Sequence, residues 1–153
     1  MKTYDASGAT VSVPDTFSLL RQIPFFAMFA SDEHLQMLLD FGDWMECASG
    51  TALIKEGSVE RYLFVLVRGK AKVLKGDTLL GEVAGPTVLG EIGAFMAEPR
   101  SATVVTDGKA TAFRISVQRF SKLPSELLYK LMCHLFQLTA QRLVDTDSRL
   151  ARV

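Results

Sequence analysis

Short apolar runs separated by glycines fill the middle of this chain and restrict the folds that it can form. Between Asp43 and Ser116, apolar residues alternate with polar ones or cluster in runs of about four to seven. Glycines stand between these runs, at positions 50, 57, 69, 76, 85 and 108. Many short strands with regularly spaced turn residues are typical of an antiparallel sandwich or jelly roll. We therefore predict a mostly β fold with flanking α-helices, built on an antiparallel β jelly roll (a double-stranded β-helix) over about residues 43–116.

Three tight turns are expected within this region. A hairpin is predicted where 61–68 (RYLFVLVR) is followed by Gly69-Lys70 and then by 71–74. Lys75-Gly76-Asp77 predicts a second turn and Asp107-Gly108 a third. Backbone conformation alone explains glycine at such turns, so we assign these glycines no chemistry.

One connection of the predicted roll is longer than a turn requires. It reads GEIGAFMAEPRSATV over residues 90–104, with a short helical turn expected at Ile92–Met96. Long insertions in compact sheets usually serve ligands. Its glycines permit close approach of backbone N–H groups to an anion, and Arg100 offers a planar fork for phosphate oxygens. Glu91 cannot bind an anion, but it can accept a hydrogen bond from a sugar hydroxyl beside a phosphate.

This segment resembles the phosphate-binding cassette of the cyclic-nucleotide-binding domain family, whose pattern is approximately G-E-[LIV]-[AG]-L-x-x-x-x-P-R-[SAT]-A-[TSW]-V. The glycine, the glutamate, the small residue Gly93, the arginine, the serine, the alanine and the valine all fall in register. The resemblance continues outside the cassette, where Gly57 follows an acidic residue and Gly69 closes the strand 62–67. It spans about residues 25–145.

The resemblance implies a site that binds a cyclic nucleotide. Arg100 would bind the equatorial oxygens of the cyclic phosphate, and Glu91 would accept from the ribose 2′-hydroxyl and help to orient Arg100. The alternatives are an Arg100 paired structurally with Glu91 or Glu98, and a Glu91 that acts only on the helix dipole. The other expected ligand contacts are the backbone of Gly90 and Ile92, the hydroxyl and N–H of Ser101, the small Ala102, and the apolar side chains of Val83 and Leu89.

The contact to the base is expected from the C-terminal helix. Arg142 is the leading candidate because a guanidinium stacks on purine faces, and Thr139 and Asp145 lie one turn away on either side. An exposed arginine beside a dimer contact is the alternative. Serine at position 101 occurs in the bacterial transcription activators of the family that answer to cyclic AMP, which favours cyclic AMP (cAMP) over cyclic GMP (cGMP).

Helices are expected before the roll. Residues 1–15 are polar and predict an extended or partly disordered arm, whereas 16–153 form the cyclic-nucleotide-binding domain. A short helix is expected to end at Pro24. A second helix should begin after the N-cap Ser31 and run to about Phe41.

Helices are also expected after the roll, over about residues 117–150. The long helix that opens at Pro124 or Ser125 carries an inner apolar stripe of Leu127, Leu131, Leu135 and Leu138. An outer stripe repeats with alternating steps of three and four, at Tyr129, Met132, Phe136, Thr139, Leu143, Thr146 and Leu150. One face for the roll and another for a partner helix predicts a homodimer. A single wide stripe buried within one subunit is the alternative.

Composition excludes several classes of function. The 153 residues carry 17 basic and 17 acidic side chains, so no global field favours nucleic acid or an anionic membrane. No apolar window approaches the length of a membrane span, and a cytoplasmic protein is expected. Cys47 and Cys133 are expected to be reduced thiols, and His34 and His134 have no partners spaced for a metal site.

We therefore expect a stand-alone cyclic nucleotide sensor with no further cofactor and no catalytic activity. Ligand would draw the cassette inward and let the C-terminal helix close over the base, with Phe113, Phe120 and Leu123 repacking near the hinge. The receiver of the signal would be an unknown effector in another chain or in another part of a longer protein. A structural dimerisation or docking module that does not respond to nucleotide is the alternative. Hydrolysis would need a metal cluster or an activated nucleophile, and the cassette offers neither.

Overall fold

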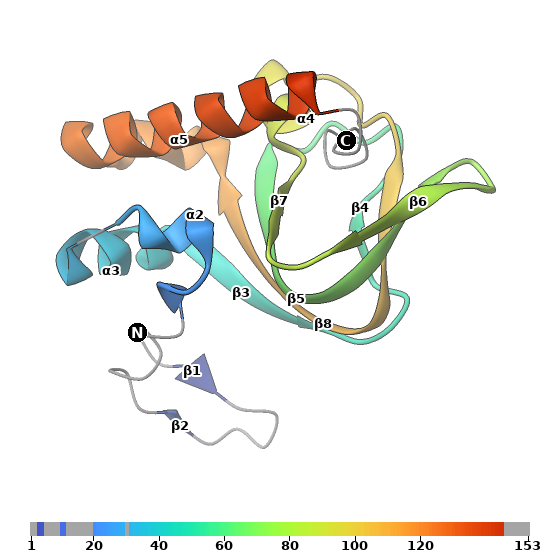
Figure 1. Cartoon of the computed structure of the whole chain (residues 1–153), viewed down its shortest axis with the longest axis horizontal. Coiled ribbons are helices and arrows are strands. Elements are labelled where there is room, and N and C mark those ends of the chain that lie inside the picture. The colour runs from blue at the N-terminus through green and yellow to red at the C-terminus, as the bar shows by residue number, and fades with distance from the viewer. Residues whose placement is uncertain (1–2, 5–9, 12–19, 30, 146–153) are drawn as a thin grey trace.

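The computed structural model describes residues 3–4, 10–11, 20–29 and 31–145, and it has the predicted architecture of an antiparallel roll with flanking helices. Figure 1 shows the curled sheet at one side of the molecule, with α5 (Ser125–Val144) running along its edge. The strands of the roll are β3 (Gly42–Cys47), β4 (Ala52–Ile54), β5 (Tyr62–Lys75), β6 (Thr78–Ala84), β7 (Thr87–Leu89) and β8 (Thr103–Ser116). They follow the order β3-β8-β5-β6, and β4 also pairs with β8 and β7 with β5, always antiparallel.

The two long strands β5 and β8 organise the roll, because each pairs with the other and with two shorter strands. Their mutual register shifts between Leu66 and Lys70, where Gly69 has a φ of 102° and Gly108 a φ of 84°. A Cβ at Gly69 would lie 2.8 Å from the Cβ of Ala110, so the two strands approach closely here. Such irregularities bend and twist a strand pair, which lets a single sheet curl over itself.

These bends correct two of the predicted turns. The chain continues as one strand through Gly69-Lys70 and again through Asp107-Gly108, so neither place is a hairpin. The turn at Lys75-Gly76-Asp77 is confirmed, since it joins β5 to β6 with Gly76 at a φ of 57°. A positive φ suits a tight turn and a bulge equally, and the pairing with β8 decides between them.

Both faces of β5 are buried, and they belong to two separate hydrophobic cores. Leu63 and Val65 point to a core shared with the helices, and Phe64 and Leu66 point to a core inside the roll. This alternation follows from the two-residue period of a strand. The core inside the roll, called the roll core below, consists of Cys47, Leu53, Ile54, Phe64, Leu66, Ala71, Val73, Leu89, Ala102, Val104, Ala110 and Ala112.

The N-terminal elements agree in part with the sequence. β1 (Thr3–Tyr4) and β2 (Thr10–Val11) form a small antiparallel ribbon within the expected arm. Pro24 begins the helix α2 (Pro24–Ala27), and proline suits a first helical position because its missing N–H has no partner there. The short helix predicted before Pro24 lies mostly outside the described residues. The helix α3 (Asp32–Asp40) is confirmed, with the Ser31 hydroxyl accepting from the N–H of His34 at 3.4 Å.

The C-terminal elements are the 3₁₀-helix η1 (Val117–Lys122) and the long helix α5. Leu127, Leu131 and Leu135 of the inner stripe are buried and Leu138 packs on the core shared with the helices, which confirms that one face of α5 covers the roll. The helix ends at Val144, short of the predicted Leu150, and Asp145 is already extended. Thr146 and Leu150 lie outside the described residues. None of the helices in the described ranges is both long and apolar enough to cross a bilayer.

Candidate functional site

The cassette between β7 and β8 forms the helix α4 (Glu91–Met96), as the sequence predicts. Gly90 precedes the helix in the left-handed conformation, with a φ of 76°. A Cβ there would lie 2.6 Å from Nη1 of Arg100, and a Cβ at Gly93 would lie 2.7 Å from the same atom. The two glycines therefore make the room that the Arg100 guanidinium occupies.

The Arg100 side chain is fully buried and held by protein groups on several sides. Its Nε donates to Oε1 of Glu60 at 2.8 Å, in an ion pair. Nη1 donates to the carbonyl of Gly90 and Nη2 to the carbonyl of Tyr62, each at 2.6 Å. Glu60, rather than the predicted Glu91, is thus the carboxylate that orients Arg100.

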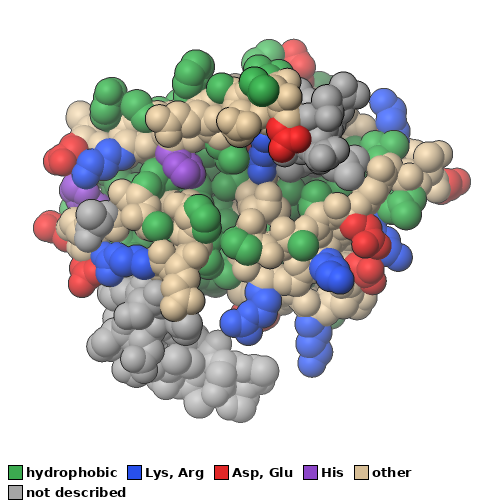
Figure 2. Space-filling model, viewed as in Figure 1, with side chains coloured by type: hydrophobic (Ala, Val, Ile, Leu, Met, Phe, Trp, Pro, Cys, Tyr) green, Lys and Arg blue, Asp and Glu red, His purple; other side chains and the backbone are tan. Residues whose placement is uncertain are grey.

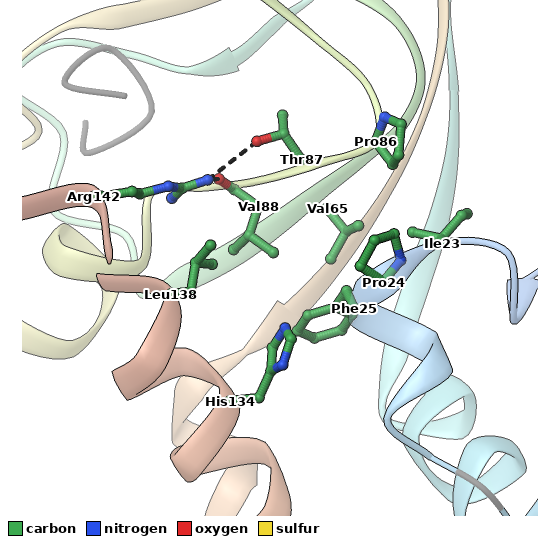
Figure 3. A pocket seen from close by; sticks show the side chains of 10 residues that line it. All are labelled: Ile23, Pro24, Phe25, Val65, Pro86, Thr87, Val88, His134, Leu138 and Arg142. Carbon is green, nitrogen blue, oxygen red and sulfur yellow. Dashed lines mark hydrogen bonds between the residues drawn. The ribbon is translucent and has the colours of Figure 1, made fainter. Parts of the chain in front are cut away.

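Glu91 instead forms a buried ion pair with Arg142 of α5. Glu91 is 2% exposed and Arg142 5%, and Nη1 of Arg142 donates to both carboxylate oxygens at 3.0 Å. The other terminal nitrogen donates to the carbonyl of Val88 and to the hydroxyl of Thr87, the latter at 3.1 Å. Figure 3 shows Arg142 reaching from α5 toward these two residues of β7. One guanidinium therefore ties the cassette, β7 and the end of α5 together.

A hollow of about 210 Å³ lies beside this ion pair, between α2, β7 and α5. Arg142 lines one end, and His134 lies at the other against Phe25, with ring centroids 5.8 Å apart (Figure 3). Burial lowers the pKa of the His134 imidazole, since a charged ring would lose solvation there. The remaining wall is mostly apolar and consists of Ile23, Pro24, Val65, Pro86, Thr87, Val88 and Leu138.

A second hollow of about 250 Å³ lies on the outer side, between α4 and α5. Its α4 wall consists of Glu91, Ile92, Phe95 and Met96, and its α5 wall of Met132, Leu135, Phe136 and Thr139. Glu91 therefore touches this hollow, while its partner Arg142 touches the first.

The structure brings four of the nine predicted site residues into two adjoining groups. Gly90 and Arg100 are in contact, and Glu91 and Arg142 form the second pair. Leu89 and Ala102 are buried in the roll core, and Val83 packs against it half-buried. Ser101 is exposed and Ile92 is half-buried. That each of these residues contacts a bound ligand stays a prediction.

Sequence reasoning missed three residues that hold this site. Glu60 lies forty positions before Arg100, and Tyr62 acts only through its backbone carbonyl. Thr87 accepts from Arg142 across a separation of 55 residues. None of these pairings has a local spacing signal. One hint in the sequence is an acidic residue two positions before the start of the strongly apolar strand β5.

Among residues 20–29 and 31–145, no three histidine, cysteine or carboxylate side chains gather as metal ligands would. The site instead offers a buried cation beside backbone carbonyls and a carboxylate neutralised by a second cation. Such an arrangement can recognise a ligand that brings both an anionic group and hydroxyl groups.

Comparisons with known proteins bear on the family and the fold of this chain. The family description "Cyclic nucleotide-binding domain" matches residues 44–126, more than half of the chain. A solved cyclic nucleotide-binding domain from Methylobacillus flagellatus is similar at 20% identity and a TM-score of 0.71, covering 89% of this chain and 83% of that one. No curated protein matches by sequence.

Two further structures are similar to this chain. The N-terminal domain of a transcriptional regulator from Streptomyces coelicolor has 26% identity and a TM-score of 0.63, covering 84% of this chain and 92% of that one. The catabolite activator protein of Thermus thermophilus has 19% identity and a TM-score of 0.66, covering 78% of this chain and 59% of that one.

Proposed function

Because the chain belongs to the cyclic nucleotide-binding domain family, we propose that it binds a cyclic nucleotide, cAMP, in the cassette without altering it. The observation that carries the proposal is the buried Arg100 at the end of the cassette. Its guanidinium lies in space that Gly90 and Gly93 leave open, and Glu60 orients it. A buried cation of this kind is suited to an anionic group that enters beside it.

The proposed contacts follow the two groups of site residues. Arg100 binds the cyclic phosphate, with the Ser101 hydroxyl and the backbone of Gly90 and Ile92 beside it. The small Ala102 lets the phosphate approach, and Val83 and Leu89 face the ligand with apolar surface. Glu91 accepts from the ribose 2′-hydroxyl. Arg142 contacts the base, which requires its guanidinium to leave Glu91 and the carbonyl of Val88.

The signal in this proposal is a movement of α5. Arg142 links the end of α5 to the cassette residue Glu91, so a ligand that claims Glu91 changes the anchoring of the helix. Domains of this family are typically regulatory and non-catalytic. In this proposal the ligand is accordingly not turned over. The effector lies in another chain or in another part of a longer protein, and the protein is located in the cytoplasm.

We further propose that the protein is a homodimer through α5. The outer stripe residues Tyr129, Phe136 and Leu143 are exposed in a single chain by 72%, 75% and 66%. Large exposed apolar side chains at heptad spacing are typical of a helix that packs on a partner.

The test is titration calorimetry with cAMP, cGMP and 2′-deoxy-cAMP. We expect cAMP to bind more tightly than cGMP, and the 2′-deoxy ligand to lose about tenfold or more because Glu91 loses its hydroxyl partner. Arg100→Ala should abolish binding, with circular dichroism as the control for folding. Ser101→Ala, at an exposed position, should weaken binding without affecting the fold. Absence of cAMP binding to the folded wild type would refute the proposal.

The second candidate is a docking module of the same fold that does not respond to nucleotide. The observation in its favour is that Arg100 and Glu91 are already satisfied by protein groups. A binder must gain thermal stability with ligand, whereas this module would unfold at the same temperature with and without millimolar cAMP. Nucleoside monophosphate after long incubation would instead indicate an enzyme.

A further inference from the structure

An exposed apolar surface runs along the outer side of α5 and continues onto the cassette helix. Figure 2 shows hydrophobic side chains projecting from the edge of the molecule along which α5 lies. The exposed apolar residues of α5 include Tyr129, Met132, Phe136 and Leu143, and on α4 Met96 is 59% exposed. We call this set, together with the hollow between α4 and α5, the outer surface.

The α5 wall of the hollow has the spacing of a coiled-coil hole. Counted from Phe136, which is itself part of this wall, the other residues lie four positions before it (Met132), one before it (Leu135) and three after it (Thr139). In parallel two-stranded coiled coils, four residues at this spacing surround the side chain that the facing helix inserts at the equivalent position. The hollow is therefore shaped for a large side chain that arrives from a second α5.

The opposite wall of the hollow belongs to the cassette. Ile92, Phe95 and Met96 complete the pocket from α4, so an inserted side chain contacts the cassette helix directly. Phe95 also packs edge-on against Phe120 of η1, with centroids 5.7 Å apart. A displacement of α4 by an inserted side chain is therefore transmitted to η1, the segment that precedes α5.

The charges on this side of α5 favour a second copy of the same chain. Cys133, Gln137 and Ala140, which are next to the stripe on its exposed side, are uncharged, so two identical helices meet without like-charge repulsion. Among the charged side chains of the helix, Glu126 and Lys130 are paired with each other at 3.7 Å, and Arg142, which precedes the stripe residue Leu143, is buried against Glu91. In the described part of the stripe, from Tyr129 to Leu143, every stripe residue is uncharged, so a strongly charged partner would find no complementary group among them.

We propose that Phe136 of a second copy inserts into the hollow between α4 and α5. The two copies are related by a two-fold axis, so each inserts its Phe136 into the hollow of the other. The cassette helix is then part of the dimer interface, and dimerisation and nucleotide binding are coupled. This inference rests on the proposed function, which supplies the dimer and the ligand. By linkage, dimerisation changes nucleotide affinity by the same factor as nucleotide changes dimer affinity.

The first test measures the dimer dissociation constant by sedimentation velocity over a dilution series. Met96→Glu places a charge on the cassette wall and should raise this constant by about tenfold or more. Leu79→Glu is the matched control, because Leu79 is 52% exposed on β6 and lies outside the outer surface, and it should leave the constant unchanged. Phe136→Glu should give monomers.

Each outcome decides a different part of the inference. If Phe136→Glu is monomeric while Met96→Glu dimerises like the wild type, the dimer stands and the role of the cassette is overturned. A wild type that is monomeric throughout would overturn the interface altogether. Calorimetry then compares cAMP affinity between the dimeric wild type and monomeric Phe136→Glu, where we expect about a fivefold difference or more. Equal affinities would refute the coupling alone, and absence of binding in both would refute the proposed ligand while the dimer result stands.

Discussion

Replacing Arg142 by methionine should destabilise the protein strongly, because it leaves the Glu91 carboxylate buried without its counter-ion. Glu91 is 2% exposed, and both of its oxygens accept from Arg142 at 3.0 Å. Removing one partner of a buried pair typically costs about 3–5 kcal/mol. The carbonyl of Val88 also loses a donor, which adds about 1 kcal/mol.

The assay is equilibrium unfolding in urea, with the thermal midpoint as a second measure. We expect Arg142→Met to lose about 4 kcal/mol of unfolding free energy, the lower part of that sum since methionine retains apolar contacts. For a chain of this size the midpoint should fall by about 10 °C. Lys130→Met is the control on the same helix. Its pair with Glu126 is 3.7 Å long between exposed side chains, and its loss should cost less than about 1 kcal/mol.

A double variant distinguishes the cost of a buried unpaired charge from the cost of altered packing. Glu91→Leu with Arg142→Leu replaces the ion pair by two apolar side chains, and it should recover most of the stability because no buried charge remains. If Arg142→Met costs no more than Lys130→Met, the pair is solvated and the reasoning is refuted. A double variant as unstable as the single one would show that shape, rather than charge, dominates the site.

Three further predictions concern glycines and a histidine. Gly93→Ala should lose about 1–2 kcal/mol despite the better helix propensity of alanine, because its Cβ would lie 2.7 Å from Nη1 of Arg100; a gain measured in urea would contradict the tight fit. Gly69→Ala should unfold at a lower urea concentration than Gly108→Ala. Both positions have a positive φ, but of the two only Gly69 has backbone close to an added Cβ, with the carbonyl oxygen of Lys109 at 2.8 Å. Equal losses of stability would refute this. Burial lowers the pKa of the His134 imidazole, so on acidification the unfolded chain binds a proton at this residue before the folded chain does, and stability should fall as the pH drops below about 6.5. His134→Gln should flatten this pH dependence in thermal melts between pH 7.5 and 5.5. An unchanged slope would contradict the prediction.

The elements that local chemistry specifies could be predicted from the sequence. Ser31 followed by two acidic residues marks the start of α3, and the helix begins there with the hydroxyl accepting a backbone N–H. The buried inner stripe of α5 follows in the same way from its spacing, and the cassette helix is expected at Ile92–Met96 within the long connection that resembles the family's cassette. Each of these depends on neighbours within about one or two helical turns.

The features that depend on distant partners could not be predicted. Glycine at positions 69 and 108 indicates only a left-handed backbone, which serves a hairpin or a bulge, and the pairing of β5 with β8 selects the bulge. The partners of the site residues are set by how β5, β7 and α5 meet in space. The sequence suggests Glu91 or Glu98 as the partner of Arg100, and only the fold shows that Glu60 takes Arg100 while Glu91 takes Arg142.

The pairing of Glu91 with Arg142 has a consequence for any ligand of the cassette. A ribose hydroxyl can replace a hydrogen bond to Glu91, but it cannot replace the positive charge that Arg142 supplies to the buried carboxylate. If separating the pair costs about 4 kcal/mol, affinity falls by about a thousandfold unless the ligand returns that energy. In the proposed site the cyclic phosphate pairs with Arg100, so the energy that separates Glu91 from Arg142 comes from the contact of the phosphate with Arg100 and from the contact of Arg142 with the base. We therefore expect a neutral nucleoside such as adenosine to leave α5 unmoved, because it brings the hydroxyls and the base but not the charge.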